Sequence, residues 1–426
     1  MSNIIDIIIA NRSGLHRGIY SVCCAQPLVI EAAIRQAIKD DSIVLIEATA
    51  NQVNQYGGYT SMQPTDFINF VSAIANKLGF PMDKIILGGD HLGPVCWVQE
   101  DAEHAMEKAK TLIESYVAAG FTKIHLDTSM PCADDPLNLP DEIVAQRAAI
   151  LCDIAERTAV KCFGQSSLVY VVGTEVPPPG GATEEITDLE LTPVARVEKT
   201  LDLHLQAFKQ RGLLAAWQRV IAIVVQPGVE FDHTSVMAYD SAKAQSLSQF
   251  ITQIPNLVYE AHSTDYQPPN AYKALVKDHF AILKVGPQLT FAMREALFAL
   301  SHIEEAYIVP EKCSNLRKVL EDEMLNNPKY WQKFYHVEPK DEVLYRRFSY
   351  SDRIRYYWNT ANVEQAVTRL FTNLTENTIP LPLISQYLPE QYHQIRLGML
   401  DTCPRTLAIQ KIMQVTRVYA DACYNS

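Results

Sequence analysis

Eight short runs of β-branched and aliphatic residues recur between residues 19 and 285 of the chain. They span residues 19–25, 43–49, 84–89, 123–127, 168–174, 220–226, 257–262 and 281–285. Most of them are followed by a polar or Gly/Pro-containing loop and then by a segment with helical periodicity. Fully buried parallel strands read as apolar runs of this length, so the pattern predicts eight strands.

The segment after the second run shows the helical pattern most clearly. Its apolar residues recur at helical spacing, at Phe67, Phe70, Val71, Ile74, Ala75 and Leu78. Pro64 stands at the predicted start of this helix and Gly79 at its end. Segments 102–119 and 141–159 have a similar pattern. Eight strand–loop–helix units predict a closed parallel (β/α)₈ barrel, known as a TIM barrel, of ~250 residues. An open doubly wound sheet is the alternative, and eight units favour closure.

The alternation of strands and helices stops near residue 300. We therefore expect a barrel over residues 1–300 and a helical extension over residues 301–426, packed on the barrel or forming an oligomer interface. Segment 345–358 combines arginines with aromatic residues. For this segment we favour packing and salt bridges over a phosphate clamp.

Composition and charge narrow the possible partners. The 426 residues are 48% hydrophobic and 20% charged, as in a globular protein, and the formal net charge is −12. This acidic balance argues against nucleic acid or an anionic membrane as the main partner, but it leaves room for a local phosphate pocket. We find no membrane-spanning run and no signal peptide, and the nine cysteines contain no CxxC pair. We expect a cytoplasmic protein with free thiols.

Polar residues gather at the predicted carboxyl ends of the strands, where barrels of this kind place their chemistry. In chain order, the main ones are Glu47, Asn51, Gln52, Asp90, His91, His125, Asp127, Glu175, Gln226, Glu260, His262, Ser263, Thr264 and Lys284. A single strand-end histidine is as often structural as functional. The convergence of many strand ends on one predicted mouth favours a functional site.

Alternation along the strands places several of these side chains inside the barrel. His125 and Asp127 share one face of the fourth strand, and Glu260 and His262 share one face of the seventh. Burying several acids together is costly unless a cation compensates. We therefore predict a divalent metal ion, with Zn²⁺ the first candidate, held by His91, His262 and one carboxylate, for which we choose Glu175.

These residues resemble the class II, metal-dependent sugar-phosphate aldolases at motif level. Asp90-His91 resembles the pair in which the aspartate transfers a proton and the histidine binds zinc. Asp127 resembles the aspartate of that family's fourth-strand motif, and His262-Ser263 its last zinc histidine with a phosphate-binding neighbour. The resemblance departs from the family at the fifth-strand loop. No histidine occurs between His125 and His204, so Glu175 would have to substitute.

A closer resemblance covers essentially the whole chain. Long motifs at 46–53, 88–94, 225–233, 260–266, 282–287, 350–358 and 384–389 are similar to those of the GatZ/KbaZ type, the Z subunit of D-tagatose-1,6-bisphosphate aldolase. The resemblance implies a non-catalytic partner of the catalytic Y subunit in galactitol or N-acetylgalactosamine breakdown. Related proteins have also been labelled tagatose-6-phosphate kinase, but the chain has no GxxxxGK[ST] loop.

Two hypotheses follow. In the first, the chain is an accessory subunit that supports the activity and stability of a Y-type aldolase. In the second, it is a metal-dependent enzyme that inverts C4 of tagatose 6-phosphate by a retro-aldol reaction. The second hypothesis assigns catalytic roles to Asp90, Glu47 and Asp127. It assigns substrate or phosphate binding to Asn51, Gln52, Gln226, Ser263, Thr264 and Lys284. For Lys284 we favour phosphate binding over Schiff-base chemistry. We also consider a homo-oligomer possible.

Overall fold

The computed structural model describes residues 4–176, 181–182, 186 and 189–424. Eight parallel strands close into a barrel in the order β1-β10-β9-β6-β5-β4-β3-β2. Their bounds are β1 Ile19–Val22, β2 Val44–Thr49, β3 Ile85–Leu92, β4 Lys123–Leu126, β5 Val169–Val172, β6 Val220–Val224, β9 Val258–Ala261 and β10 Phe280–Val285. The predicted (β/α)₈ barrel is confirmed, and each predicted run overlaps one of these strands. A small antiparallel pair, β7 (Glu230–Phe231) and β8 (Val236–Met237), follows β6.

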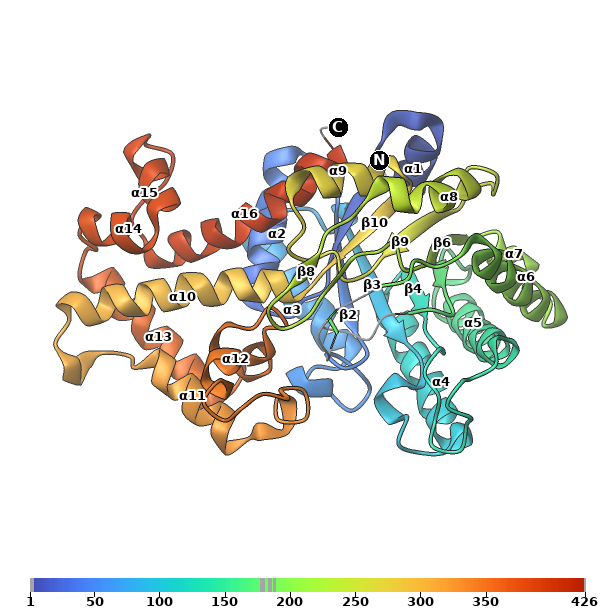
Figure 1. The fold of residues 1–426 in the computed structure, drawn as a ribbon, viewed down its shortest axis with the longest axis horizontal. Helices are drawn as coiled ribbons and strands as arrows, with labels where there is room; N and C mark the ends of the chain where they lie inside the picture. The colour runs from blue at the N-terminus through green and yellow to red at the C-terminus, as the bar shows by residue number, and fades with distance from the viewer. Residues whose placement is uncertain (1–3, 177–180, 183–185, 187–188, 425–426) are drawn as a thin grey trace.

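Helices surround the barrel (Figure 1). The helices of the barrel region are α1 Ile4–Ala10, α2 Pro27–Asp40, α3 Pro64–Leu78, α4 Ala102–Ala119, α5 Asp141–Phe163, α6 Val194–Gln210, α7 Leu214–Trp217, α8 Ser241–Ile251, α9 Pro269–Lys277 and α10 Pro287–Tyr307. Helix α3 has the predicted ends, because Pro64 occupies its first turn and Gly79 ends it in the left-handed conformation, with φ 67°.

The C-terminal region is helical, and its last helix belongs to the barrel wall. Its helices are α11 Leu316–Asn326, α12 Glu342–Phe348, α13 Ala361–Glu376, α14 Leu381–Tyr387, α15 Pro389–Arg396 and α16 Pro404–Tyr424. Figure 1 shows α10 leaving the barrel and α16 returning beside it, and α16 packs against α2, α9, α10 and β1. The predicted boundary at residue 300 falls inside α10. The extension therefore completes the helical ring.

The barrel interior changes character along its axis. At one end, a cluster that we call the apolar floor joins Ile4, Ile7 and Ile8 of α1 to inward-facing strand residues such as Leu45 and Ile282. Two residues further along β2 and β10, the inward positions become Glu47 and Lys284. Helix α1 thus plugs the amino-terminal end, and the polar side chains collect toward the carboxyl ends of the strands.

Candidate active site at the barrel mouth

A cavity of about 110 Å³ opens at the carboxyl ends of the strands. Of the residues predicted for the site, those that line it are Asn51, Gln52, Asp90, His91, His262, Ser263 and Lys284. Two further lining residues, Arg355 and Tyr356, come from the C-terminal extension.

A break in the strand pattern brings Asp90 and His91 to the same cavity. Consecutive strand residues normally point to opposite faces of a sheet. Here the β3–β4 register shifts between Gly89 and Leu92, and His91 takes a left-handed conformation with φ 50°. The irregularity turns the His91 ring toward the mouth beside Asp90, in the way that bulges re-aim side chains near active sites.

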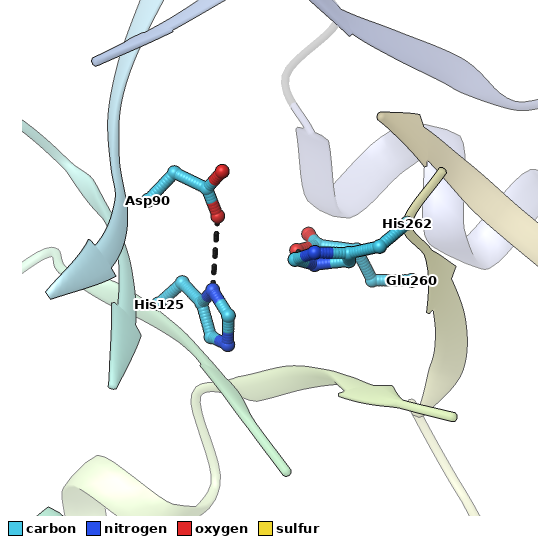
Figure 2. A group of neighbouring side chains, drawn as sticks. All are labelled: Asp90, His125, Glu260 and His262. Atoms are coloured by element: carbon cyan, nitrogen blue, oxygen red, sulfur yellow. Dashed lines mark hydrogen bonds and ion pairs between the residues drawn. The ribbon is translucent and has the colours of Figure 1, made fainter. Parts of the chain in front are cut away.

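Four buried side chains converge below the cavity, and we call them the tetrad: Asp90, His125, Glu260 and His262. Figure 2 shows them pointing toward one another from β3, β4 and the end of β9. Asp90 Oδ1 lies 2.9 Å from His125 Nδ1, and His262 Nε2 lies 3.0 Å from Glu260 Oε1. One ligand atom from each of the four lies within 4.8 Å of the other three.

Two buried lysines tie the carboxylates together. Lys123 Nζ lies 2.6 Å from Glu47 Oε1 and 2.7 Å from Glu260 Oε2, and all three side chains are fully buried. Lys284 pairs with the other oxygen of Glu47 and lies 3.0 Å from Asp90 Oδ1. Gly88 leaves room for this network, because a Cβ there would lie 2.2 Å from Glu47 Oε1. The network fixes the carboxylates before any ligand binds.

Asp127 orients His91. Its Oδ2 lies 2.8 Å from His91 Nδ1, and its Oδ1 accepts a hydrogen bond from the hydroxyl of Ser129. The other ring nitrogen of His91, Nε2, lies 3.7 Å from Asp90 Oδ2. Carboxylate–histidine pairs of this kind hold one imidazole nitrogen while the other faces a metal or a substrate.

The electrostatics of the site favour ionised carboxylates. Burial by itself would raise the pKa of Asp90, but the nearby imidazoles, His91 foremost, hold it well below its usual range. Burial opposes ionisation of Glu260 too, yet Lys123 and His262 lower its pKa to about 2.

The histidines and Lys284 respond differently to the same burial. Burial lowers the pKa of His262 below its usual value. It would also lower that of His91, but Asp90 and Asp127 outweigh it and raise the pKa of His91 to about 9. Burial lowers the pKa of Lys284 to about 8. At neutral pH, Lys284 and His91 therefore both carry positive charge among the carboxylates.

Several predicted residues lie away from the cavity. Glu175 accepts a hydrogen bond from Thr192 Oγ1 at 2.6 Å and pairs with Arg196 Nε at 3.2 Å, so the structure does not bring it to the tetrad. Gln226 accepts hydrogen bonds from the backbone of the loop that follows it. The Thr264 hydroxyl donates to the backbone oxygen of Lys284.

Glu47 and Asp127 hold other site residues in place. Neither lines the cavity; they are buried behind it and bind Lys284 and His91. The positions thus separate the predicted residues into those that reach the cavity and those that support it.

Sequence reasoning missed Lys123 and left His125 and Glu260 out of the ligand set. The signal for Lys123 was available, because Lys123, His125 and Asp127 alternate on one face of the fourth strand. It also missed Arg355 and Tyr356 as cavity residues. Their position depends on how the extension folds back, and no local pattern reports that.

The tetrad fits a divalent metal ion. Imidazole nitrogens and carboxylate oxygens are the usual non-thiolate ligands of Zn²⁺, at ~2.0–2.2 Å from the ion. His125 Nε2 is buried and has no hydrogen-bond partner among the described residues. A buried polar atom without a partner is costly, and an ion would satisfy it. The donor set and this atom both match a metal centre.

Fold and site together define a (β/α)₈-barrel protein with a buried carboxylate–imidazole group at its mouth. The chain belongs to the D-tagatose-1,6-bisphosphate aldolase subunit GatZ/KbaZ-like family, whose pattern matches residues 4–424. The predicted resemblance is confirmed.

One solved structure is similar over nearly the whole chain. A structure described as a probable tagatose 6 phosphate kinase from Sinorhizobium meliloti 1021 is 46% identical. The match covers 96% of this chain and 100% of that chain, with a TM-score of 0.88.

More distant matches are aldolases. The YdjI aldolase from Escherichia coli K12 is 12% identical over 89% of this chain and 99% of that chain, with a TM-score of 0.43. Fructose-bisphosphate aldolase from Campylobacter jejuni is 14% identical over 87% of this chain and 93% of that chain, with a TM-score of 0.40. Both likenesses are too weak to inform the site. Within the described residues, none of the helices has the length and apolar character needed to cross a membrane.

Proposed function

We propose that the barrel mouth is a metal-dependent active site for a ketohexose phosphate, and that the chain inverts C4 of tagatose 6-phosphate by a retro-aldol reaction. The observation that carries this proposal is the tetrad, with its four ligand atoms buried within 4.8 Å of one another. A scaffold has no need to bury such a group, because buried ionised side chains are costly to keep.

We assign the metal ligands to His125, Glu260 and His262, with His91 beside them as a further candidate. The centroid of the His91 ring lies 5.0 Å from that of His262. Three protein ligands leave an open position, as in catalytic zinc sites. An ion such as Zn²⁺ held here would supply Lewis-acid stabilisation of negative charge on the ketose oxygens.

Asp90 is the proposed proton-transfer residue. It belongs to the tetrad and lines the cavity, and Lys284 lies 3.0 Å from its Oδ1. Its carboxylate takes the proton of the C4 hydroxyl as the C3–C4 bond breaks, which gives a three-carbon enediolate and an aldehyde. After the aldehyde rotates, C3 attacks its other face, and Asp90 returns the proton to the new C4 hydroxyl.

Asp90→Asn tests the proposal in the isolated chain. It keeps the shape of the side chain and removes the proton acceptor. Conversion of tagatose 6-phosphate to fructose 6-phosphate should fall at least ~100-fold, the lower range for loss of a general base. Asp322→Asn, the same change at an exposed aspartate of α11 that pairs with Lys318, is the control. Absence of conversion by the wild-type chain, loaded with Zn²⁺, Mn²⁺ or Co²⁺ in turn, would contradict the proposal.

A second candidate function is that of a non-catalytic partner of a catalytic aldolase subunit in galactitol or N-acetylgalactosamine breakdown. Membership of an aldolase-subunit family favours it. Co-expression should then raise the soluble yield and activity of a Y-type aldolase, and Asp90→Asn should leave this effect unchanged. The partner's half-life with and without this chain, at matched concentrations, decides the point. Equal half-lives would contradict the accessory role.

A further inference from the structure

The C-terminal extension contributes two side chains to the cavity, Arg355 and Tyr356. Both belong to a short helical turn, Arg353–Tyr357, in the arginine- and aromatic-rich segment. The cavity that they line also contains Asp90 and His262 of the tetrad. One ligand can therefore contact the extension and the barrel chemistry at the same time.

Arg355 differs from the two arginines of α12 and from Arg294 of α10, each of which has a carboxylate partner. Arg346 and Arg347 pair with Glu321, and Arg294 pairs with Asp352. Among the described residues, no carboxylate lies within ion-pair distance of the Arg355 guanidinium. Asp352 and the cavity residue Asp265 act on its charge only from further away, so a bound anion would supply the direct partner that it lacks.

The guanidinium is held in place and keeps donors to spare. Nη1 donates to the backbone oxygens of Ser351 and Asp352, and Nη2 donates to the Tyr356 hydroxyl at 2.9 Å. The guanidinium carbon also lies 4.4 Å from the centroid of the Tyr356 ring. These three hydrogen bonds use at most three of the five N–H groups of arginine. The remaining donors suit the oxygens of a phosphate.

The barrel fixes the segment that carries Arg355. Asp352, whose φ is 44°, accepts hydrogen bonds from Thr290 Oγ1 at 2.7 Å and Arg294 Nε at 2.9 Å, both on α10. The backbone N–H of Tyr350 donates to the backbone oxygen of His233 at 2.9 Å. A segment tied down in this way presents its arginine at a defined position, which limits the ordering cost of binding.

We infer that Arg355, supported by Tyr356, forms an anion subsite of this cavity that binds the phosphate group of the substrate. The inference rests on the proposed function for the identity of the sugar. The expectation that the site binds a phosphate group rests on the guanidinium of Arg355. It deepens that function, because it makes the extension responsible for selecting phosphorylated over free ketohexoses.

The test measures binding to the full chain by calorimetry with three probes: D-tagatose 6-phosphate, D-tagatose and inorganic phosphate. Arg355→Met should weaken binding of the sugar phosphate at least ~10-fold, as expected for loss of a charge-assisted hydrogen bond, and leave D-tagatose unchanged. Arg347→Met is the matched control, because it removes an arginine of the same segment that pairs with Glu321, and it should bind all probes as the wild type does.

Arg355→Lys keeps the charge and loses the planar fork, so its affinity should lie between those of the wild type and Arg355→Met. It also decides the question if Arg355→Met fails to fold, as judged by its melting curve. Wild-type affinity for the sugar phosphate in a folded Arg355 variant would overturn the inference. So would equal losses for the phosphorylated and free sugars, or a wild-type chain that binds neither phosphate probe.

The same variants separate this inference from the proposed function. If the wild-type chain shows no turnover but binds the sugar phosphate in an Arg355-dependent way, the result supports the anion subsite and contradicts the proposed enzymatic function. If the chain turns the substrate over and Arg355→Met leaves KM unchanged, the result supports the proposed enzymatic function and contradicts the anion subsite.

Discussion

The two ends of the barrel interior are built from the same strands but differ in character, because one end is apolar and the other holds charged side chains. On β9, Val258 faces the apolar floor, while Glu260 belongs to the tetrad. On β10, Ile282 and Lys284 make the same change over two residues. The floor needs only close packing. The mouth needs charges that compensate one another, so single substitutions there should have consequences that the floor does not show.

The largest effect on stability is expected at Lys123. Lys123→Met leaves Glu47 and Glu260 buried with less compensating charge, and breaking a buried ion network from one side costs ~3–5 kcal/mol. Urea unfolding of the metal-free chain measures it. Lys318→Met, which removes an exposed pair with Asp322, should cost less than ~1 kcal/mol. Equal losses of unfolding free energy in the two variants would contradict the claim that the buried charges at the mouth compensate one another.

At the floor, Leu45→Ala should destabilise the chain by ~2–5 kcal/mol through lost burial and the cavity left behind. Leu45 is fully buried against α1 and neighbouring strands. Unlike substitutions at the mouth, this one should affect stability alone. Metal content and KM of the folded Leu45→Ala protein should match the wild type. A change in either would mean that the two ends are coupled.

The free energy of unfolding should depend on pH through Glu230, at the rim of the mouth. Burial raises the pKa of Glu230 to about 7, against an ordinary 4.5. The folded state therefore binds this proton more tightly than the unfolded state does. Its contribution is fully present below pH 4.5 and is lost as pH rises through 7, amounting to up to ~3 kcal/mol.

Glu230→Gln should flatten the unfolding free energy across pH 4.5–7, relative to the wild type. The exposed control Glu107→Gln should leave the profile unchanged. A Glu230→Gln profile that falls as steeply as that of the wild type would rule out this carboxyl as the source.

A smaller effect is expected at Asp127, which holds His91 from behind. Asp127→Asn should leave the fold intact and weaken metal binding ~10–100-fold, the usual cost of losing the partner of a ligating histidine. A competition titration with a zinc chelator measures the affinity. Unchanged affinity would exclude His91 from the ligand set.

The sequence predicted the barrel well because each strand carries its own local signal. The runs at 43–49 and 123–127 are buried on both sides and read as strands without tertiary information. Alternation also placed His125, Asp127, Glu260 and His262 correctly inside the barrel.

The rest depended on structure that no local pattern encodes. The β3 irregularity that turns His91 to the mouth is a departure from period two. Glu175 was predicted to end the fifth strand, but β5 ends at Val172 and Arg196 on α6 pairs with Glu175 through tertiary packing. In the arginine-rich segment, too, only part of the outcome was predicted from the sequence. Arg346 and Arg347 form the predicted salt bridges, whereas Arg355 reaches the cavity because the extension folds back over the barrel.

The central claim is that the tetrad binds a divalent ion, and elemental analysis of the full chain, purified without a metal-chelating resin and incubated with zinc, tests it most directly. The account predicts about one ion per chain for the wild type. It predicts loss of that ion in the double variant His125→Ala/His262→Ala, with the fold checked by circular dichroism. A wild-type chain without bound metal, or a folded double variant that retains it, would contradict the claim.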